Sequence, residues 1–372
     1  MATPFWELVL IYNLIYNLIY KFIRRISMTT KLRFGLVGAG AIAQSYIQAF
    51  ESTDIAQLVG IADVDLSRAS SLAERLGCQS FASHEDLVNS IEIDAAIVCT
   101  PPITHLDVSR YLLEHKIHVL CEKPLSVNSA QAKLMVEAAK QAGVILTMAS
   151  KFRYVEDVIR AKQIVSSGIL GEIVLFENAF TGRVDMSKRW NSQPQISGGG
   201  VLIDNGTHSV DIMRYFLGAL DEIQVVEGKR IQGLAVEDTV QIFVKSASGV
   251  RGSIDLSWSI NKELDSYIRI YGSQGTISVG WRESKYRQAS SSDWVVFGKG
   301  YNKVQAFRSQ IENFTKAIRG EEQLIITAED GLASVAAIES AYAAMMQTSW
   351  TRIGHHNLRV LPTNEVPAVA LG

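Results

Sequence analysis

From Lys31 onward, the sequence alternates short apolar runs with stretches of helical periodicity, and this alternation limits the folds open to the chain. The apolar runs are LRFGLV, AQLVGIA, IDAAIVC, IHVLC and VILTM. The helical stretches between them cover residues 44–50, 66–76, 106–114 and 130–142. Strands that alternate with helices pair in parallel through right-handed crossovers. The first part of the chain is therefore predicted to be a doubly wound α/β domain.

The turn after the first apolar run carries a glycine pattern. In GLVGAGAIA, Gly38, Gly40 and Ala43 form a G-x-G-x-x-A arrangement between a strand and a helix. Such a turn brings a pyrophosphate close to the backbone, and the helix N-terminus binds its charge. The second strand ends at Asp63, where a carboxylate binds the adenosine ribose hydroxyls and repels a 2′-phosphate. The pattern predicts NAD as the cofactor, with NADP less favoured.

Two further loops follow strands of the same sheet. CTPPITH follows IDAAIVC and CEKP follows IHVLC, so both loops lie at the carboxyl edge, where ligands of such sheets bind. The lysine before proline could also be an exposed loop charge. The predicted cofactor-binding residues are Gly38, Gly40, Ala41, Ile42, Asp63, Thr100, Pro101, Pro102, His105, Glu122 and Lys123.

A second glycine-rich stretch, ISGGGVLIDNGTHSVD, lies further along the chain. If a helix begins near Gly200, then Asp204 and His208 are one turn apart and project side by side. The glycines before them would let the chain lie close to a ligand, because glycine has no Cβ. The alternative is an ordinary polar pair on the surface of a helix. The glycines and the upstream EKP favour the functional interpretation.

These motifs together resemble one family. GAGAIA, IADVD, CTPPITH, EKP and GGGVLIDNGTHSVD occur in the order and spacing of the glucose-fructose oxidoreductase and inositol dehydrogenase (Gfo/Idh/MocA) family, from about Leu32 to about Ile353. The resemblance implies an N-terminal Rossmann domain and a C-terminal α+β domain with a large, mostly antiparallel open sheet. It also implies hydride transfer between a nicotinamide and a carbinol carbon of a sugar, polyol or sugar derivative.

The sequence after Ser150 is consistent with that second domain. EIVLFENAF, TVQIFVKSASGVRGSIDLSWSI and SYIRIYGSQGTISVG have alternating apolar residues and Ser-Gly or Gln-Gly turns, as in an antiparallel sheet. Helical patterns return at residues 304–319 and 328–346, and the second helix is expected to pack across both domains. The predicted organisation is an apolar extension (1–28), an NAD-binding domain (29–150), a substrate-binding and oligomerisation domain (151–354) and an irregular tail (355–372).

The candidate catalytic residues are Lys123, Asp204 and His208. A histidine that titrates near neutral pH is suited to take the hydroxyl proton, while Lys123 stabilises the developing alkoxide. Lys123 could instead be the proton acceptor, because groups at close range titrate as a unit. Asp204 would orient the substrate or balance the lysine charge. The candidate substrate-binding residues are Lys123, Arg153, Tyr154, Trp190, Asp204 and His208, with Arg183 and Asn191 as further candidates.

Two other functions are consistent with the same motifs. One is a regulator that binds a dinucleotide without catalysis, and it is disfavoured because the lysine and the histidine are both present. The other is a hydrolase or lyase that uses NAD transiently, with no net redox change. Release of NADH would separate a dehydrogenase from both alternatives.

Composition narrows the partners. A formal net charge of -2 and the lack of a dense Lys/Arg stripe disfavour nucleic acid as a partner. No cluster has the spacing of metal ligands, so no metal is expected. The three cysteines lack CxxC spacing and indicate reduced thiols in a cytoplasmic protein. The open sheet face predicts a homodimer or a homotetramer.

The first 28 residues differ from the rest, because LVLIYNLIYNLIYKFIRR is almost wholly apolar. Its positive charges follow the apolar run, which is unlike a secretory signal. Asn13 and Asn17 interrupt a segment that would need about 20 apolar residues to span a membrane. A membrane-spanning anchor is less favoured than the non-spanning alternatives, which include a translation start at Met28. If the segment is an anchor, its Lys/Arg cluster holds the catalytic domain on the cytoplasmic side.

Overall fold

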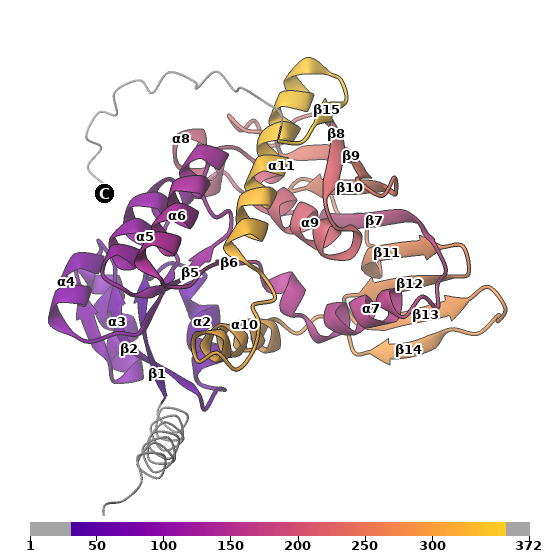
Figure 1. The fold of residues 1–372 in the computed structure, drawn as a ribbon. Helices are drawn as coiled ribbons and strands as arrows, with labels where there is room; N and C mark the ends of the chain where they lie inside the picture. The colour runs from indigo at the N-terminus through magenta and orange to yellow at the C-terminus, as the bar shows by residue number, and fades with distance from the viewer. Residues whose placement is uncertain (1–30, 355–372) are drawn as a thin grey trace, which may run out of the picture.

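The computed structural model describes residues 31–354, which form two sheets with helices packed on and between them (Figure 1). The first sheet has six parallel strands in the order β3-β2-β1-β4-β5-β6. They are β1 (Leu32–Val37), β2 (Ala56–Ala62), β3 (Gln79–Phe81), β4 (Ala95–Val98), β5 (His118–Glu122) and β6 (Leu146–Ala149). The strand order reverses between β1 and β4, and ligands of such sheets bind at this reversal.

The helices of the first domain begin and end close to the positions predicted from the sequence. They are α2 (Ala43–Phe50), α3 (Leu66–Leu76), α4 (His84–Ser90), α5 (His105–Glu114) and α6 (Ser129–Ala142). Asp65 and Asn128 cap α3 and α6 through hydrogen bonds from backbone N–H groups, and both helices end at a left-handed glycine. The sequence did not predict β3 and α4, because such short elements carry little periodicity.

The second sheet has nine strands in the order β14-β13-β12-β11-β7-β10-β9-β8-β15. They are β7 (Ile173–Thr181), β8 (Leu220–Glu227), β9 (Thr239–Ser246), β10 (Arg251–Ser257), β11 (Ser266–Gly272), β12 (Gly275–Gly280), β13 (Ser284–Gln288), β14 (Val295–Gly298) and β15 (Thr351–Arg352). β7 and β10 pair in parallel, and the other recorded pairings are antiparallel. The predicted fold class, a Rossmann domain followed by a mostly antiparallel sheet domain, is confirmed.

One face of the second sheet is covered by helices and the other is open. On β9, Val240, Ile242 and Val244 are buried, whereas Gln241 is exposed and Lys245 is partly exposed. The covering helices are α7 (Glu156–Ser166), α9 (Val201–Leu217) and α11 (Ala328–Gln347). In Figure 1, α9 and α11 lie between this sheet and the first domain, whereas α7 lies over the part of the sheet near β12 and β14. The alternation predicted for β9 is therefore confirmed.

The end of the described chain returns to the first domain. The helix α10 (Lys303–Ile318) lies against α2, with the rings of Phe307 and Tyr46 4.7 Å apart at their centroids. Phe314 packs on Phe34 in the same core. The helix α11 contacts α6 in the first domain as well as α9 and β8 in the second, so the predicted packing across both domains is confirmed.

The predicted apolar extension (1–28) and the predicted irregular tail (355–372) lie outside the described residues. Within residues 31–354, no helix is long and apolar enough to cross a membrane.

Candidate active site

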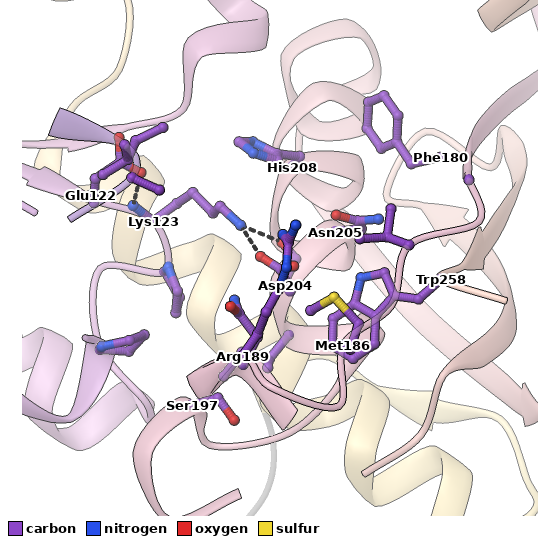
Figure 2. Close-up of a pocket in the computed structure, with 18 of the residues that line it drawn as sticks. Glu122, Lys123, Phe180, Met186, Arg189, Ser197, Asp204, Asn205, His208 and Trp258 are labelled. Carbon is purple, nitrogen blue, oxygen red and sulfur yellow. Dashed lines mark hydrogen bonds and ion pairs between the residues drawn. The ribbon is translucent and has the colours of Figure 1, made fainter. Parts of the chain in front are cut away.

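The two domains line one cavity of about 590 Å³ at the carboxyl edge of the first sheet. Figure 2 shows its charged centre, where Lys123 extends from the first domain toward Asp204 and His208 on α9. A cavity of this size suits a small ligand and part of a cofactor. The predicted site residues that line it are Gly40, Ala41, Ile42, Thr100, Pro102, Glu122, Lys123, Trp190, Asp204 and His208, together with Asn191.

Lys123 and Asp204 form an ion pair across the domain boundary. Lys123 directly follows β5, and its Nζ also donates a hydrogen bond to the main-chain oxygen of Asp204 at 2.9 Å. Asp204 lies in the first turn of α9, where a carboxylate is stabilised by the helix N-terminus. The side chains are 14% and 23% exposed, so both remain accessible from the cavity. The pair therefore presents a fixed ammonium group to any ligand there.

His208 lies one turn beyond Asp204 and is only 6% exposed. The ring of Phe152 packs edge-on against the imidazole, with 5.0 Å between the ring centroids. Burial, followed by the charges of Lys123 and Lys151, lowers the pKa of His208 well below its usual value. The expectation that this histidine titrates near neutral pH is therefore corrected, because the imidazole is neutral there.

Two of the three glycines before α9 have a different role from the one expected. A Cβ on Gly200 would collide with the main-chain oxygen of Glu237, and a Cβ on Gly199 would collide with the hydroxyl of Tyr342. The Glu237 carboxylate accepts hydrogen bonds from the N–H groups of Gly200 and Leu202 at 2.9 and 3.1 Å. These two glycines make room for the groups that hold the start of α9, and not directly for a ligand.

The glycine turn after β1 is shaped to receive a dinucleotide. Gly38 has φ +101°, and a Cβ there would meet the backbone of Cys99 and Thr100. A Cβ on Gly40 would instead point into open space. That space lies in the cavity beside the N-terminus of α2, where backbone N–H groups can bind a pyrophosphate. The residues present therefore fit the cofactor that the sequence predicts.

Asp63 supports this turn from the end of β2. Its Oδ2 accepts a hydrogen bond from the N–H of Ala39 at 2.6 Å, and its Oδ1 accepts one from the N–H of Asp65 at 2.8 Å. Asp63 does not line the cavity itself. Each carboxylate oxygen can accept a second hydrogen bond, so the group keeps the capacity to bind a ribose hydroxyl.

Glu122 lines the cavity beside Lys123. Its Oε1 accepts a hydrogen bond from the hydroxyl of Tyr46 at 2.7 Å, and Gln310 donates to the same hydroxyl at 3.1 Å. Burial raises the pKa of Glu122, although Tyr46 and Lys123 oppose this shift. The sequence singled out Glu122 but not Tyr46 or Gln310, since only the fold brings α2, β5 and α10 together.

Two residues expected to bind substrate lie outside the cavity. Arg153 is buried and forms a two-fold hydrogen-bonded ion pair with Asp211, at 3.0 and 2.6 Å. Tyr154 is fully buried, and its hydroxyl lies 3.4 Å from Asn313. Both expectations are corrected, because these side chains fix the domain interior and are not free to meet a ligand. Arg183 does not line the cavity either.

His105 also has a structural role in place of the expected contact with the cofactor. It is fully buried, and its ring nitrogens lie 2.9 Å from the main-chain oxygen of Pro124 and 2.8 Å from that of Thr100. His105 thus joins the two loops that follow β4 and β5. Pro101 and Gly38 shape the same edge without lining the cavity.

Several lining residues were not predicted. They are charged or polar (Lys151, Arg189, Asn205 and Lys303) or apolar (Phe152, Phe180, Met186, Trp258 and Trp281). Lys151 and Phe152 stand in the stretch KFRY, and Arg189 in RWN, so the stretches were noticed but these positions were not chosen. A strand-end position would have favoured Lys151, which follows β6 closely.

Among the residues that the structure describes, no group of three or more His, Cys, Asp or Glu side chains could hold a metal ion.

Comparison with known proteins is consistent with this geometry. Residues 32–150 match the family model described as "Oxidoreductase family, NAD-binding Rossmann fold", and residues 158–278 match the GFO/IDH/MocA C-terminal domain. The rhizopine catabolism protein MocA of Rhizobium meliloti is 25% identical over 321 residues, which are 84% of this chain and 94% of that protein. Myo-inositol 2-dehydrogenase of Thermotoga maritima is 26% identical over 317 residues, 81% of this chain and 92% of that protein.

Solved structures show the same fold. Levoglucosan dehydrogenase in complex with NADH and levoglucosan superposes with a TM-score of 0.81 at 22% sequence identity. The superposition covers 87% of this chain and 99% of that one. The chain belongs to the Gfo/Idh/MocA family of oxidoreductases, with an NAD-binding Rossmann domain and the family's C-terminal domain.

Proposed function

We propose that the protein oxidises a carbinol carbon of a sugar, a polyol or a sugar derivative. The observation that carries this proposal is the position of Lys123 and His208, which face one cavity that also contains the glycine turn. The relatives named myo-inositol 2-dehydrogenase and levoglucosan dehydrogenase support the same class of reaction. NAD, when bound, supplies the hydride acceptor.

In this proposal Lys123 binds the substrate hydroxyl. Its ammonium group, held by Asp204, donates a hydrogen bond to the oxygen that becomes alkoxide-like in the transition state. A donor that is already fixed needs no reorganisation as the negative charge develops, so it stabilises the transition state more than the bound substrate. We therefore expect Lys123 to make the largest contribution of the site's side chains to transition-state stabilisation.

His208 takes the hydroxyl proton in the same step. Its Nδ1 lies 3.5 Å from the hydroxyl of Ser150, which leaves Nε2 for the substrate. The lowered pKa keeps the imidazole neutral and ready to accept a proton, but it also makes His208 a weak base. The benefit of His208 is therefore smaller than that of Lys123. Asp204 orients the ammonium group.

Mixing the full chain with NAD and a panel of sugars and polyols tests the function. Formation of NADH with at least one of them is the expected result. A regulator would bind NADH, as seen by its fluorescence, and turn over nothing. A hydrolase or lyase would convert a substrate without net NADH formation. Either result would contradict the proposed dehydrogenase function and support the corresponding alternative.

The open sheet face supports a further proposal, that two copies associate through the C-terminal domain. Phe243 is partly exposed on this face, where Lys245 and Asp255 pair with Glu222 and Lys262. Like faces meet in most two-fold assemblies. Light scattering of a chain that begins at Met28 is expected to give a dimer or tetramer mass. A monomer mass at every concentration would contradict it.

A cytoplasmic location stays a prediction from the cysteines.

A further inference from the structure

The cavity contains more cations than its own carboxylates can balance. Lys123, Lys151, Arg189 and Lys303 all line it. Lys123 is paired with Asp204. Within residues 31–354, no carboxylate lies within ion-pair distance of the other three. Unpaired cations that face one cavity favour an anionic ligand.

Lys303 lines the cavity close to Lys151. It begins α10, one turn before Phe307. Its Nζ lies 6.0 Å from the centroid of the Phe307 ring, which Lys151 also contacts at 5.7 Å. The charge of Lys303 therefore adds to that of Lys151 in the same part of the cavity.

Lys151 lies in the half of the cavity that holds the reacting groups. Its side chain contacts the rings of Phe152 and Phe307, with Nζ 5.3 and 5.7 Å from their centroids. Its charge acts on Glu122, Lys123 and Asp204 and on His208. Burial and the neighbouring lysines lower the pKa of Lys151 to about 8. The group is thus charged at neutral pH but lacks an acceptor among the described residues.

Arg189 adds further positive charge to the cavity lining. It precedes the short helix η3 (Trp190–Ser192), in the segment between β7 and α9, and it points into the cavity in Figure 2. The two carboxylates near Lys151, those of Glu122 and Asp204, are already bound by Tyr46 and Lys123. Neither carboxylate forms an ion pair with Lys151 or Arg189, so both cations remain available to an anionic group of the substrate.

We propose that the substrate is a sugar acid, whose carboxylate binds Lys151 while its carbinol group faces Lys123 and His208. The inference rests on the proposed dehydrogenase function. The carbinol carbon loses a hydride to the nicotinamide and its hydroxyl loses a proton to His208. The sugar acid becomes a keto acid, and NAD becomes NADH. Arg189 attracts the anion toward the cavity.

Matched substrate pairs test this inference with the full chain. We expect kcat/KM for NADH formation to be at least tenfold higher with D-gluconate than with D-glucitol, or with D-glucuronate than with D-glucose. The preference is expected to decline as the pH rises past about 8, because Lys151 then loses its charge. Higher kcat/KM with D-glucose 6-phosphate than with D-glucuronate would overturn the assignment of a carboxylate.

Variants locate the preference. Lys151→Met keeps the apolar stem and removes the charge, so the ratio of acid to neutral substrate should fall at least tenfold. Lys162→Met is the matched control, since Lys162 also lies over an aromatic ring, 5.5 Å from the centroid of Tyr215, but does not line the cavity. The control should keep the wild-type ratio. An unchanged ratio in Lys151→Met would remove Lys151 from the site.

The outcomes separate the two proposals. If no substrate of either kind forms NADH, the dehydrogenase function fails. If the neutral members react and the acids do not react better, only the sugar acid fails. Quenching of NADH fluorescence by the acid in a non-reacting complex gives a readout of binding apart from turnover. Because the comparison of substrates uses the wild-type protein, it remains decisive even if Lys151→Met does not fold.

Discussion

The two walls of the cavity are built in different ways. The first domain contributes residues at strand ends, namely the open turn at Gly40, whose backbone is free to meet a ligand, and the loops after β4 and β5. The second domain contributes side chains from α9, from η2 (Lys151–Tyr154) and from the segment after β7. Backbone geometry binds what all dinucleotides share, whereas side chains determine which substrate reacts. The comparison explains why the cofactor is easier to assign than the substrate.

Lys123 tests this comparison, because it belongs to the first domain but contacts Asp204, a candidate substrate-binding residue of the second domain. Lys123→Ala is expected to lower kcat by about a hundredfold or more, since it removes the fixed donor to the developing alkoxide. NADH affinity should stay within a few-fold, because the glycine turn is unchanged. Stopped-flow rates and NADH fluorescence titration measure the two effects.

Loss of NADH affinity comparable to the loss of rate would contradict this division of roles. Lys140→Ala is a suitable control. Lys140 is on α6, pairs with Glu329 at 2.8 Å and does not line the cavity. It should keep the wild-type rate.

The same division explains what the sequence could predict. The elements around Gly38, Asp63 and Lys123 follow from strand and helix periodicity, and a motif places them at one sheet edge. The roles of Arg153 and Gly200 could not be predicted this way, because their partners, Asp211 and Glu237, are 58 and 37 residues away in sequence. The sequence did not predict Lys151 because a single lysine belongs to no motif. Its lack of an ion-pair partner is visible only in the folded structure.

Two glycines offer a direct comparison of the walls. Gly40→Ala adds a methyl group to open space, so stability should change by less than about 0.5 kcal/mol. NADH affinity should fall about tenfold or more, because the methyl group occupies the approach of the pyrophosphate. Gly200→Ala meets the main-chain oxygen of Glu237 and should cost roughly 1–3 kcal/mol of unfolding free energy.

Urea unfolding and NADH titration of both variants test this contrast. Equal loss of stability in the two variants would show that the turn at Gly40 is packed and not open. A Gly200→Ala variant with wild-type stability would mean that the start of α9 can move away from Glu237.

Substitution of Asp63 tests whether the first domain also distinguishes NAD from NADP at the ribose of the cofactor. Asp63→Ser should shift the NAD to NADP ratio of kcat/KM by about tenfold or more toward NADP, since a hydrogen bond to a charged group contributes about 1.5–3 kcal/mol. Asp63→Asn is the matched control for charge, because its side-chain oxygen can still accept from the N–H of Ala39. If the NAD to NADP ratio of kcat/KM does not change in Asp63→Ser, then Asp63 only supports the glycine turn and does not bind the ribose.

The smallest expected effect is a displacement of the pH profile without a change in its plateau. His208 must be neutral to accept the proton, and its pKa lies well below the usual value because of burial and the charges of Lys123 and Lys151. With a neutral polyol as substrate, kcat/KM should therefore stay level as the pH falls through 6.5 and decline only at lower pH. Lys151→Met removes one of the two positive charges, which raises the pKa of His208 and moves the acid limb to higher pH. If the wild-type kcat/KM already declines at or above pH 6.5, the second domain does not keep His208 neutral. The role of proton acceptor would then have to be assigned to another group.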